Sequence, residues 1–82
     1  MDNSIKFKFH SGHTGAVMHF KVHMDTKFEQ VIKTYCKRQG IEDQAEYKFL
    51  FEGQPISPEQ KPSSIGLEDE DVIDVFKRQI GG

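Results

Sequence analysis

Two stretches near the start of the chain alternate strictly between apolar and polar side chains. Residues 5–10 place apolar side chains at the odd positions and basic ones at the even positions, and residues 18–24 place apolar side chains at every even position. A period of two is typical of a β-strand with one buried face. Two glycines lie between these stretches, in residues 11–15, so we predict a β-hairpin over residues 1–24.

The next stretch changes from a period of two to a helical period. Apolar side chains at positions 28, 31, 32, 35 and 36 form one face of an amphipathic helix. The residues at its start have the form of a capping box, in which Thr26 and Glu29 each accept a hydrogen bond from the other's backbone amide. Gly40 supplies a left-handed stop after two basic residues that suit the helix dipole. We therefore predict one helix over about residues 26–39.

The second half of the chain contains three further predicted strands. Residues 47–51 are rich in aromatic side chains, residues 54–56 form a short return strand after a turn, and residues 72–76 form the last strand. Residues 57–66 indicate a loop with a single helical turn. This order predicts an α+β fold, the β-grasp roll, with a mixed sheet of four to five strands and one main helix packed on one face. The first and last strands lie side by side in parallel in this arrangement.

Length and composition limit the chain to one small domain. It has 82 residues, of which 35% are apolar, and no stretch approaches the roughly 18 apolar residues of a membrane span. The single cysteine, Cys36, cannot form an internal disulfide and falls on the apolar helical stripe, where we expect an unreactive thiol. We therefore expect a soluble, intracellular monomer that makes no membrane contact.

The net charge of −2 conceals two halves of opposite sign. Residues 1–41 carry seven Lys and Arg against three Asp and Glu, whereas residues 42–82 carry four against ten. Such an asymmetry predicts docking surfaces of opposite sign on one small body. It argues against nucleic acid as the main ligand, because phosphate binding favours a net basic face with stacking aromatics.

The chain ends in Gln79-Ile80-Gly81-Gly82, directly after the last predicted strand. Two glycines leave no side chain beside the terminal carboxylate, so this backbone can pass through a narrow channel. Taken alone, a Gly-Gly end is also typical of a frayed terminus or an engineered addition. The rest of the chain has to decide between these interpretations.

Four stretches carry a resemblance to a known family. They are residues 20–22 (Phe-Lys-Val), 35–40 (Tyr-Cys-Lys-Arg-Gln-Gly), 49–54 (Phe-Leu-Phe-Glu-Gly-Gln) and 70–75 (Glu-Asp-Val-Ile-Asp-Val). Together with the terminal glycines they resemble SUMO, the small ubiquitin-like modifiers, over nearly the whole chain. The resemblance implies a protein modifier that is processed to its glycines, activated with ATP and joined through Gly82 to lysines of target proteins.

The resemblance also implies a division of the chain and a set of partners. Residues 1–4 would form a short arm, 5–78 a ubiquitin-like domain and 79–82 a conjugation tail. Processing and activation would read Gln79, Ile80 and Gly81. The partners would be the SUMO activating and conjugating enzymes, SUMO-specific proteases, ligases and proteins with SUMO-interacting motifs, in the nucleus and cytoplasm. ATP and magnesium would bind the activating enzyme, so we expect no cofactor on this chain.

Two further surfaces follow from the resemblance. One is a groove between the second strand and the helix, which would take a SUMO-interacting motif as an added strand. Its residues would be Phe20, Lys21, Val22, His23, Val31, Thr34, Tyr35 and Arg38. The other surface would hold the conjugating enzyme through Lys48, Glu52, Gly53, Gly66, Glu68 and Asp71. The alternatives are that Phe20 and Val22 are simply core, and that residues 68–71 are a solvated acidic loop.

The sequence contains no motif of an enzyme or a metal site. His19 and His23 lie about 13 Å apart along a strand, too far to share an ion. There is no nucleophile elbow, no phosphate-binding loop and no carboxylate pair with catalytic spacing. We therefore predict no catalytic residue and no metal ligand. Two other functions stay open: an interaction domain that is not conjugated, and a β-grasp sulfur carrier, which would need neither the groove nor the Phe-Leu-Phe-Glu-Gly-Gln stretch.

Overall fold

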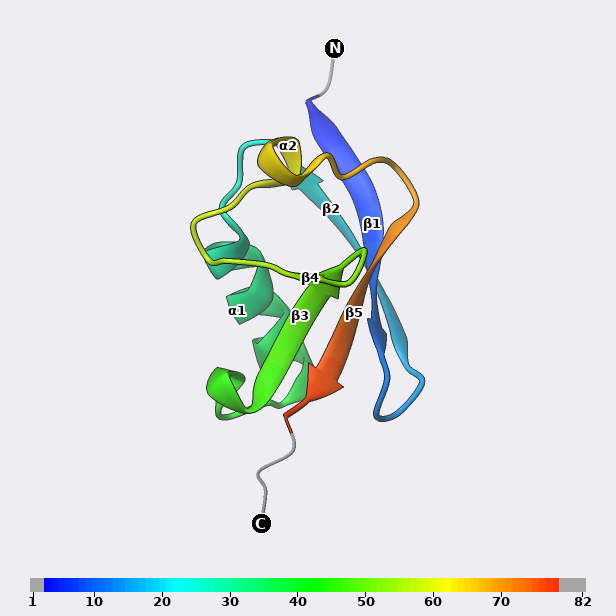
Figure 1. Cartoon of the computed structure of the whole chain (residues 1–82), viewed down its shortest axis with the longest axis vertical. Coiled ribbons are helices and arrows are strands. Elements are labelled where there is room, and N and C mark those ends of the chain that lie inside the picture. The colour runs from blue at the N-terminus through cyan, green and yellow to red at the C-terminus, as the bar shows by residue number, and fades with distance from the viewer. Residues whose placement is uncertain (1–2, 79–82) are drawn as a thin grey trace.

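The computed structural model describes residues 3–78, so the predicted conjugation tail lies outside the described residues. The elements are β1 (Ser4–Ser11), β2 (Val17–His23), α1 (Phe28–Gln39), the 3₁₀ turn η1 (Gln44–Glu46), β3 (Tyr47–Phe51), β4 (Gln54–Pro55), α2 (Pro62–Ile65) and β5 (Asp71–Lys77). Figure 1 shows one sheet with α1 lying across one of its faces. The hairpin, the main helix and the single helical turn before Gly66 are confirmed, whereas η1 was not predicted.

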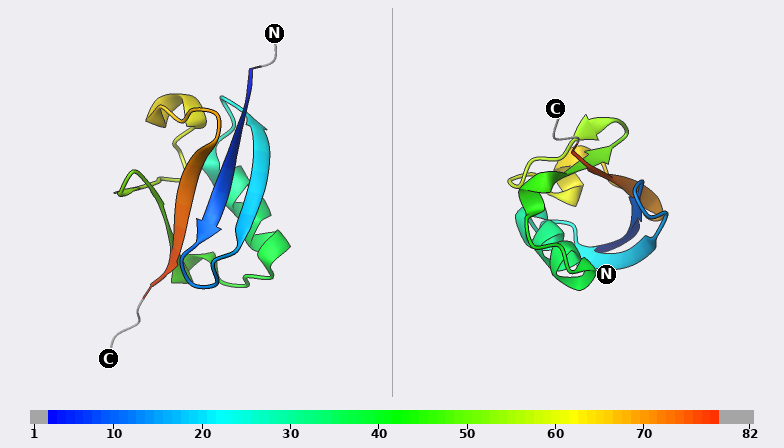
Figure 2. Two further views of the ribbon diagram at one scale, coloured as in Figure 1. Left: turned by 90° about the vertical axis from the view of Figure 1, so that its right-hand side faces the viewer. Right: turned by 90° about the horizontal axis from the view of Figure 1, so that it is seen from below.

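The five strands form one mixed sheet in the order β2-β1-β5-β3-β4. β1 pairs antiparallel with β2 and parallel with β5, and β5 pairs antiparallel with β3. The predicted parallel contact between the first and last strands is therefore confirmed, and with it the β-grasp arrangement. Seen from below, the sheet curves around α1 (Figure 2). β2 is left at the edge of the sheet, next to the helix.

Aromatic rings fill the space between the sheet and α1. The Phe9 side chain is fully buried, and its ring centroid lies 4.5 Å from that of Tyr35, 5.2 Å from that of Phe20 and 5.9 Å from that of Phe49. These rings come from β1, β2, α1 and β3, so one cluster ties four elements together. The apolar side chains of the alternating strands and those of the apolar face of the helix thus pack into a single core.

The start of α1 differs from the prediction. Lys27, not Thr26, is the N-cap residue, and no side chain caps the helix. The backbone amide of Phe28 donates to the carbonyl of Gln60 at 2.8 Å, and that of Glu29 donates to the carbonyl of Pro58 at 3.0 Å. The predicted capping box is therefore wrong, because the loop before α2 lies against the helix and supplies these acceptors. The other end follows the prediction, with Gly40 in the left-handed region at φ 71°.

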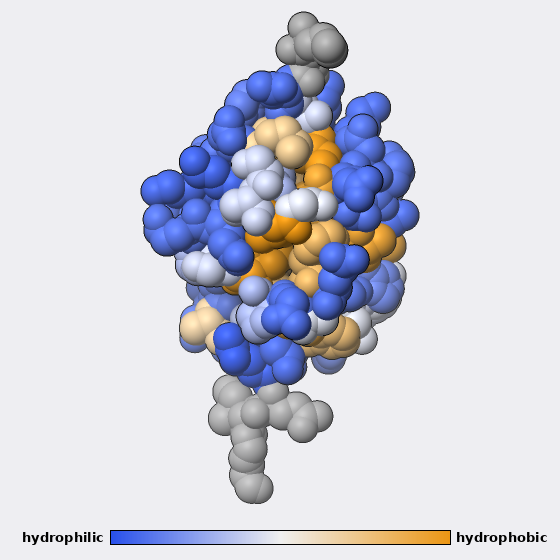
Figure 3. All heavy atoms as spheres, turned by 45° about the horizontal axis from the view of Figure 1, so that its top comes forward, coloured by the Kyte–Doolittle hydropathy of each residue, from blue (hydrophilic) through white to orange (hydrophobic). Residues whose placement is uncertain are grey.

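The surface is mostly hydrophilic. Figure 3 shows polar side chains over most of one face, with an apolar strip through its middle. Among the described residues, the large apolar side chains with the greatest exposure are Val17, Val72 and Phe76. No helix in the described part of the chain is long and apolar enough to cross a membrane. The Cys36 thiol is buried as predicted, and this burial raises its pKa.

Candidate functional site

A groove runs between β2 and α1, where the resemblance predicted one. It encloses about 280 Å³ and is lined by Phe20, Lys21, Val22, Thr26, Gln30, Val31, Thr34 and Arg38. The structure thus brings together all the predicted groove residues except His23 and Tyr35. It adds Thr26, which lies between β2 and α1, and Gln30, which lies in the first turn of α1.

The local structure suits the groove to an extended peptide. β2 is an edge strand with β1 on one side, so its other edge borders the groove. Edge strands can accept a further strand through their backbone groups, and pockets beside them then read alternate side chains. The Arg38 guanidinium carbon lies 5.0 Å from the centroid of the Phe20 ring, a cation–π distance that holds a positive charge beside the apolar floor.

Tyr35 and His23 lie elsewhere. Tyr35 is only 2% exposed, and its ring packs between Phe9 and Phe49, so it belongs to the core behind the groove rather than to the groove wall. Burial raises the pKa of the Tyr35 phenol, and the nearby Cys36 adds to the effect. The His23 side chain is at the exposed end of β2, where its Nδ1 accepts from the Asp25 amide at 3.1 Å. Phe20 combines both roles, because it is buried in the core and also lines the groove.

The predicted surface for the conjugating enzyme is spread over several elements. Glu52 and Gly53 form the turn between β3 and β4, and Gly66 ends α2. Glu68 and Asp71 bracket the turn before β5, since the Glu68 amide donates to the Asp71 carboxylate at 2.7 Å. This acidic turn is therefore a defined structure held by its own hydrogen bonds.

Lys48 stands apart from that acidic turn. It is opposite Phe76, near the end of β5, whereas Asp71 is the first residue of the same strand. Lys48 instead lines an open hollow of about 620 Å³ together with Leu50, Phe76, Lys77 and Arg78. This hollow lies beside the point where the chain leaves β5 toward the predicted tail.

Arg78 is anchored in a way that the sequence did not indicate. Its backbone amide donates to the Glu46 carbonyl at 2.7 Å, and its Nε donates to the Ala45 carbonyl at 3.0 Å. Both acceptors belong to η1, which Asp43 caps by accepting from the Ala45 amide at 3.0 Å. The short turn thus holds the last residue before the predicted tail. The four tail residues themselves are outside the described part of the chain.

The groove and the acidic turn are surfaces on which another chain could dock. Within residues 3–78, no three His, Cys, Asp or Glu side chains gather at metal-binding distance. The one thiol in that range is buried with a raised pKa, which lowers its thiolate fraction and its reactivity.

Comparison with known proteins agrees with this geometry. The family model described as "Ubiquitin-2 like Rad60 SUMO-like" matches residues 3–76. Small ubiquitin-related modifier 2 of Homo sapiens and small ubiquitin-related modifier 3 of Gallus gallus are each 42% identical over 72 residues, which is 88% of this chain and 75% and 76% of theirs. A solved structure titled "Caldiarchaeum Subterraneum Ubiquitin" superposes with a TM-score of 0.83 at 18% identity, covering 96% of this chain and 99% of that one. This last likeness shows the fold.

Proposed function

The chain belongs to the SUMO-like family of ubiquitin-like proteins, and from this premise we propose that it is attached through the carboxylate of Gly82 to lysine amines of target proteins. The observation that carries the proposal is the combination of 42% identity to small ubiquitin-related modifiers with a Gln-Ile-Gly-Gly ending. The identity to modifiers supports interpreting the Gly-Gly ending as a conjugation tail rather than as an isolated pair of glycines.

The chemistry requires only a carboxylate and a slim tail from this chain. Forming an amide from a free carboxylate in water is uphill, so the carboxylate must first be activated. ATP converts it to an acyl adenylate with loss of pyrophosphate, and an enzyme thiol then displaces AMP to give a thioester. The lysine amine finally displaces that thiol. Side chains beside Gly82 would hinder each transfer, and the two glycines provide none.

The partners follow from this role. We propose that SUMO-specific proteases and the activating enzyme read Gln79, Ile80 and Gly81, and that the conjugating enzyme docks on the acidic turn at Glu68 and Asp71. ATP and magnesium would bind to the activating enzyme, and this chain performs no catalysis itself. Its places of action would be the nucleus and the cytoplasm, where its relatives' pathway operates.

The groove between β2 and α1 suits a second, non-covalent role. We propose that it binds short apolar SUMO-interacting motifs as an added strand along β2. The apolar floor at Phe20, Val22 and Val31 supports this role, as does the charge that Lys21 and Arg38 bring to its rim. Acidic residues flanking the motif would complement those two cations.

An ATP-dependent charging assay tests conjugation. The protein is mixed with SUMO activating and conjugating enzymes, and a non-reducing gel is examined for an adduct that thiols remove. A variant lacking Gly82 and a parallel reaction with ubiquitin activating enzyme are the controls. We expect an adduct that requires Gly82 and the SUMO enzymes. A folded protein that gives no adduct with either system would leave the non-conjugated interaction domain or the sulfur carrier.

Two valines of β2 provide a matched test of the groove. Val22 lines it, whereas Val17 is on the same strand but outside the groove and is 49% exposed. The probe is a synthetic peptide with four branched apolar residues followed by three glutamates. We expect Val22→Ala to weaken its binding about five- to tenfold, from the lost apolar contact, and Val17→Ala to leave it unchanged. Equal effects of the two substitutions would show that the peptide does not bind in the groove.

A further inference from the structure

The loop between β4 and α2 contains the one serine or threonine in the sequence that a proline follows directly. This residue is Ser57, with Pro58 after it, and both are exposed and outside any helix or strand. Steric contact with a proline ring disfavours the helical backbone in the preceding residue, so Ser57 favours an extended conformation. Exposed loop segments of this kind are the parts of a folded protein that enter the active sites of modifying enzymes.

The backbone of Ser57 is held firmly, whereas its hydroxyl proton is not. The Ser57 amide donates to the Gln60 side-chain oxygen at 2.7 Å, and the Gln60 amide donates back to the Ser57 carbonyl at 3.0 Å. The Ser57 Oγ accepts from the Glu59 amide at 3.4 Å, and within residues 3–78 it donates to no other group. The hydroxyl therefore lies on a defined turn with its proton free for transfer.

The two serines of α2 differ from Ser57 in this respect. The Ser63 hydroxyl donates to the Asp25 carboxylate at 3.2 Å, and the Ser64 hydroxyl donates to the Lys61 carbonyl at 2.9 Å. Both of these bonds would have to break before either oxygen could react as a nucleophile. Ser57 is thus set apart by its hydrogen bonding as well as by the proline after it.

The same loop closes the start of α1. The Phe28 amide donates to the Gln60 carbonyl and the Glu29 amide to the Pro58 carbonyl, so the residue after Ser57 is one of the two that bond to the helix. The first turn of α1 also forms one wall of the groove between β2 and α1. A group added at Ser57 therefore acts on the contact that holds this turn.

Positive charge lies beside the loop from two sources. The Lys27 ammonium is 3.2 Å from the Glu59 carboxylate, and these side chains are 52% and 71% exposed. Water screens an exposed pair of this kind, so a stronger anion nearby can displace the carboxylate. Lys27 is also the N-cap residue of α1, at the positive end of the helix dipole. A phosphate at Ser57 would thus meet both the ammonium and the dipole.

We propose that Ser57 is a phosphorylation site for a kinase that selects serine followed by proline. The Ser57 Oγ forms a bond to the γ-phosphorus of ATP, the bond from that phosphorus to ADP breaks, and the hydroxyl proton passes to the base of the kinase. The proposal goes beyond attachment through Gly82 and does not depend on it.

The phosphate then strengthens the contact between the loop and α1. It carries a charge of about −1.5 to −2 and three acceptor oxygens, so it attracts Lys27 more strongly than the single charge of Glu59 does. One phosphate oxygen takes over as acceptor for the Glu59 amide, which already donates to the Ser57 Oγ. Phosphorylation thereby fastens the loop to the first turn of the helix.

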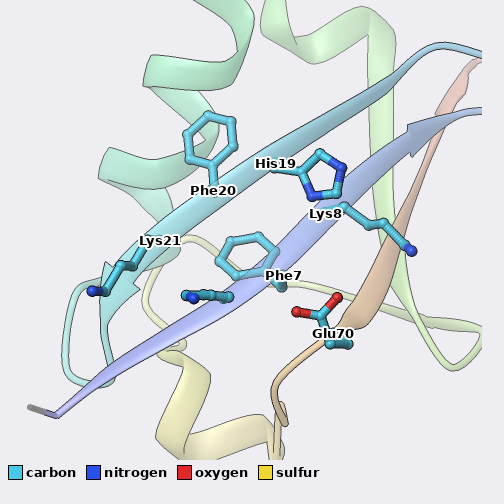
Figure 4. Close-up of a pocket in the computed structure, with 7 residues that line it drawn as sticks. Phe7, Lys8, His19, Phe20, Lys21 and Glu70 are labelled. Carbon is cyan, nitrogen blue, oxygen red and sulfur yellow. The ribbon is translucent and has the colours of Figure 1, made fainter.

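The cations of β1 and β2 take no part in this site. Phe7 and Phe20 belong to the core beneath α1, so Lys8, which follows Phe7 in β1, lies on the outer face of the sheet. In Figure 4 the Lys8 and Lys21 ammonium groups point away from each other over that face. Lys8 therefore serves as a control for the loss of one positive charge away from the loop.

The first test is phosphorylation of the folded full chain by a proline-directed mitogen-activated protein kinase with ATP, mapped by mass spectrometry. We expect phosphate at Ser57 and none in Ser57→Ala. Pro58→Ala keeps the carbonyl that bonds to the helix and should lower the rate about tenfold or more. Pro55→Ala, where the proline follows Gln54, should leave the rate unchanged. Phosphate mainly at another residue, or equal rates for the two proline variants, would overturn the proposal.

The second test is hydrogen exchange of the Phe28 and Glu29 amides before and after phosphorylation. We expect exchange to slow about three- to fivefold, because the loop that carries their acceptors is held more tightly. Lys27→Gln should remove most of this slowing, whereas Lys33→Gln, exposed on the same helix, and Lys8→Gln should retain it. Faster exchange after phosphorylation, or no effect of Lys27→Gln, would overturn the proposed contact. Charging at Gly82 is measured separately, so the two proposals fail independently.

Discussion

Phe9 is the residue on which the packing of this domain most depends. It is fully buried, and its ring contacts rings from β2, α1 and β3. Aromatic pairs at these separations contribute beyond the apolar area that they bury. The small size of the domain leaves it few other places to gain such stability.

We therefore expect Phe9→Ala to lower the free energy of unfolding by about 3–5 kcal/mol, the usual cost of removing a buried aromatic side chain. Phe76→Ala is the control, because Phe76 is 40% exposed, and it should cost less than about 1 kcal/mol. Urea denaturation of both variants measures the difference. Similar costs for the two would contradict the packing described here.

Because of Cys36 and Tyr35, we expect the free energy of unfolding of the domain to fall at alkaline pH. Burial raises the pKa of the thiol above its ordinary 9.0 and that of the phenol above its ordinary 10.0. Above about pH 9 the unfolded chain therefore loses these protons before the folded one does, and the free energy of unfolding falls as pH rises. Denaturation between pH 8 and 11 should show this fall. Cys36→Ala should make it shallower in its first part, and an unchanged slope would rule the thiol out as a cause.

At the scale of elements, α1 is held by the loop that precedes α2. Its first amides bond to the carbonyls of Pro58 and Gln60, and the Gln60 side chain braces that loop by accepting from the Ser57 amide at 2.7 Å. Thr26, which the capping-box pattern selected, does not cap the helix. The entry of the chain into the helix is thus a tertiary contact.

Two alanine substitutions distinguish a helix start held by the loop before α2 from one capped by the Thr26 side chain. Gln60→Ala should cost about 0.5–1.5 kcal/mol of unfolding free energy, because the loop loses a hydrogen bond. Thr26→Ala should cost less than about 0.5 kcal/mol, whereas a side-chain cap would be worth about 1 kcal/mol. Thermal unfolding of both variants decides. A larger loss for Thr26→Ala would restore the capping box.

The sequence predicted elements well where their signal was local. The period of two across residues 5–10 and 18–24 and the helical stripe after Phe28 each depend on neighbouring side chains, and the structure has strands and a helix there. The helix cap could not be predicted, because its acceptors come from residues about thirty positions later. Likewise η1 is a short turn whose contacts with Arg78 join distant parts of the chain.

The groove shows where a resemblance stops being sufficient. The resemblance located the space between β2 and α1, but it assigned Tyr35 to the wall of the groove, whereas the Tyr35 side chain packs into the core. Matching a position in a family indicates which element a residue belongs to, and only the packing decides the direction of its side chain. His23 was placed in the groove for the same reason and lies outside its lining.

At the scale of the whole molecule, the strands of the two charged halves of the sequence lie next to each other in one sheet, with β2 and β1 toward one edge and β5, β3 and β4 toward the other. The basic first half forms β1, β2 and α1, and the acidic second half supplies the turn at Glu68 and Asp71. The two meet where the Glu70 backbone amide donates to the Lys6 carbonyl at 2.8 Å. One small body therefore carries an apolar groove and an acidic turn on different elements.

Attachment through Gly82 would form an amide between its carboxyl group and the side-chain amine of a target lysine, and mass spectrometry can detect that bond directly. Trypsin cleaves after Arg78, so a conjugate digested with trypsin should leave Gln-Ile-Gly-Gly on the modified lysine. The protein is incubated with SUMO activating and conjugating enzymes, ATP and a lysine-bearing substrate, and the digest is sequenced by mass spectrometry. We expect this four-residue branch on substrate lysines when ATP is present, and no such branch when ATP is left out. If the protein forms the thioester with the enzymes but the digest contains no such branch, or a branch that begins at another residue, attachment through Gly82 is contradicted.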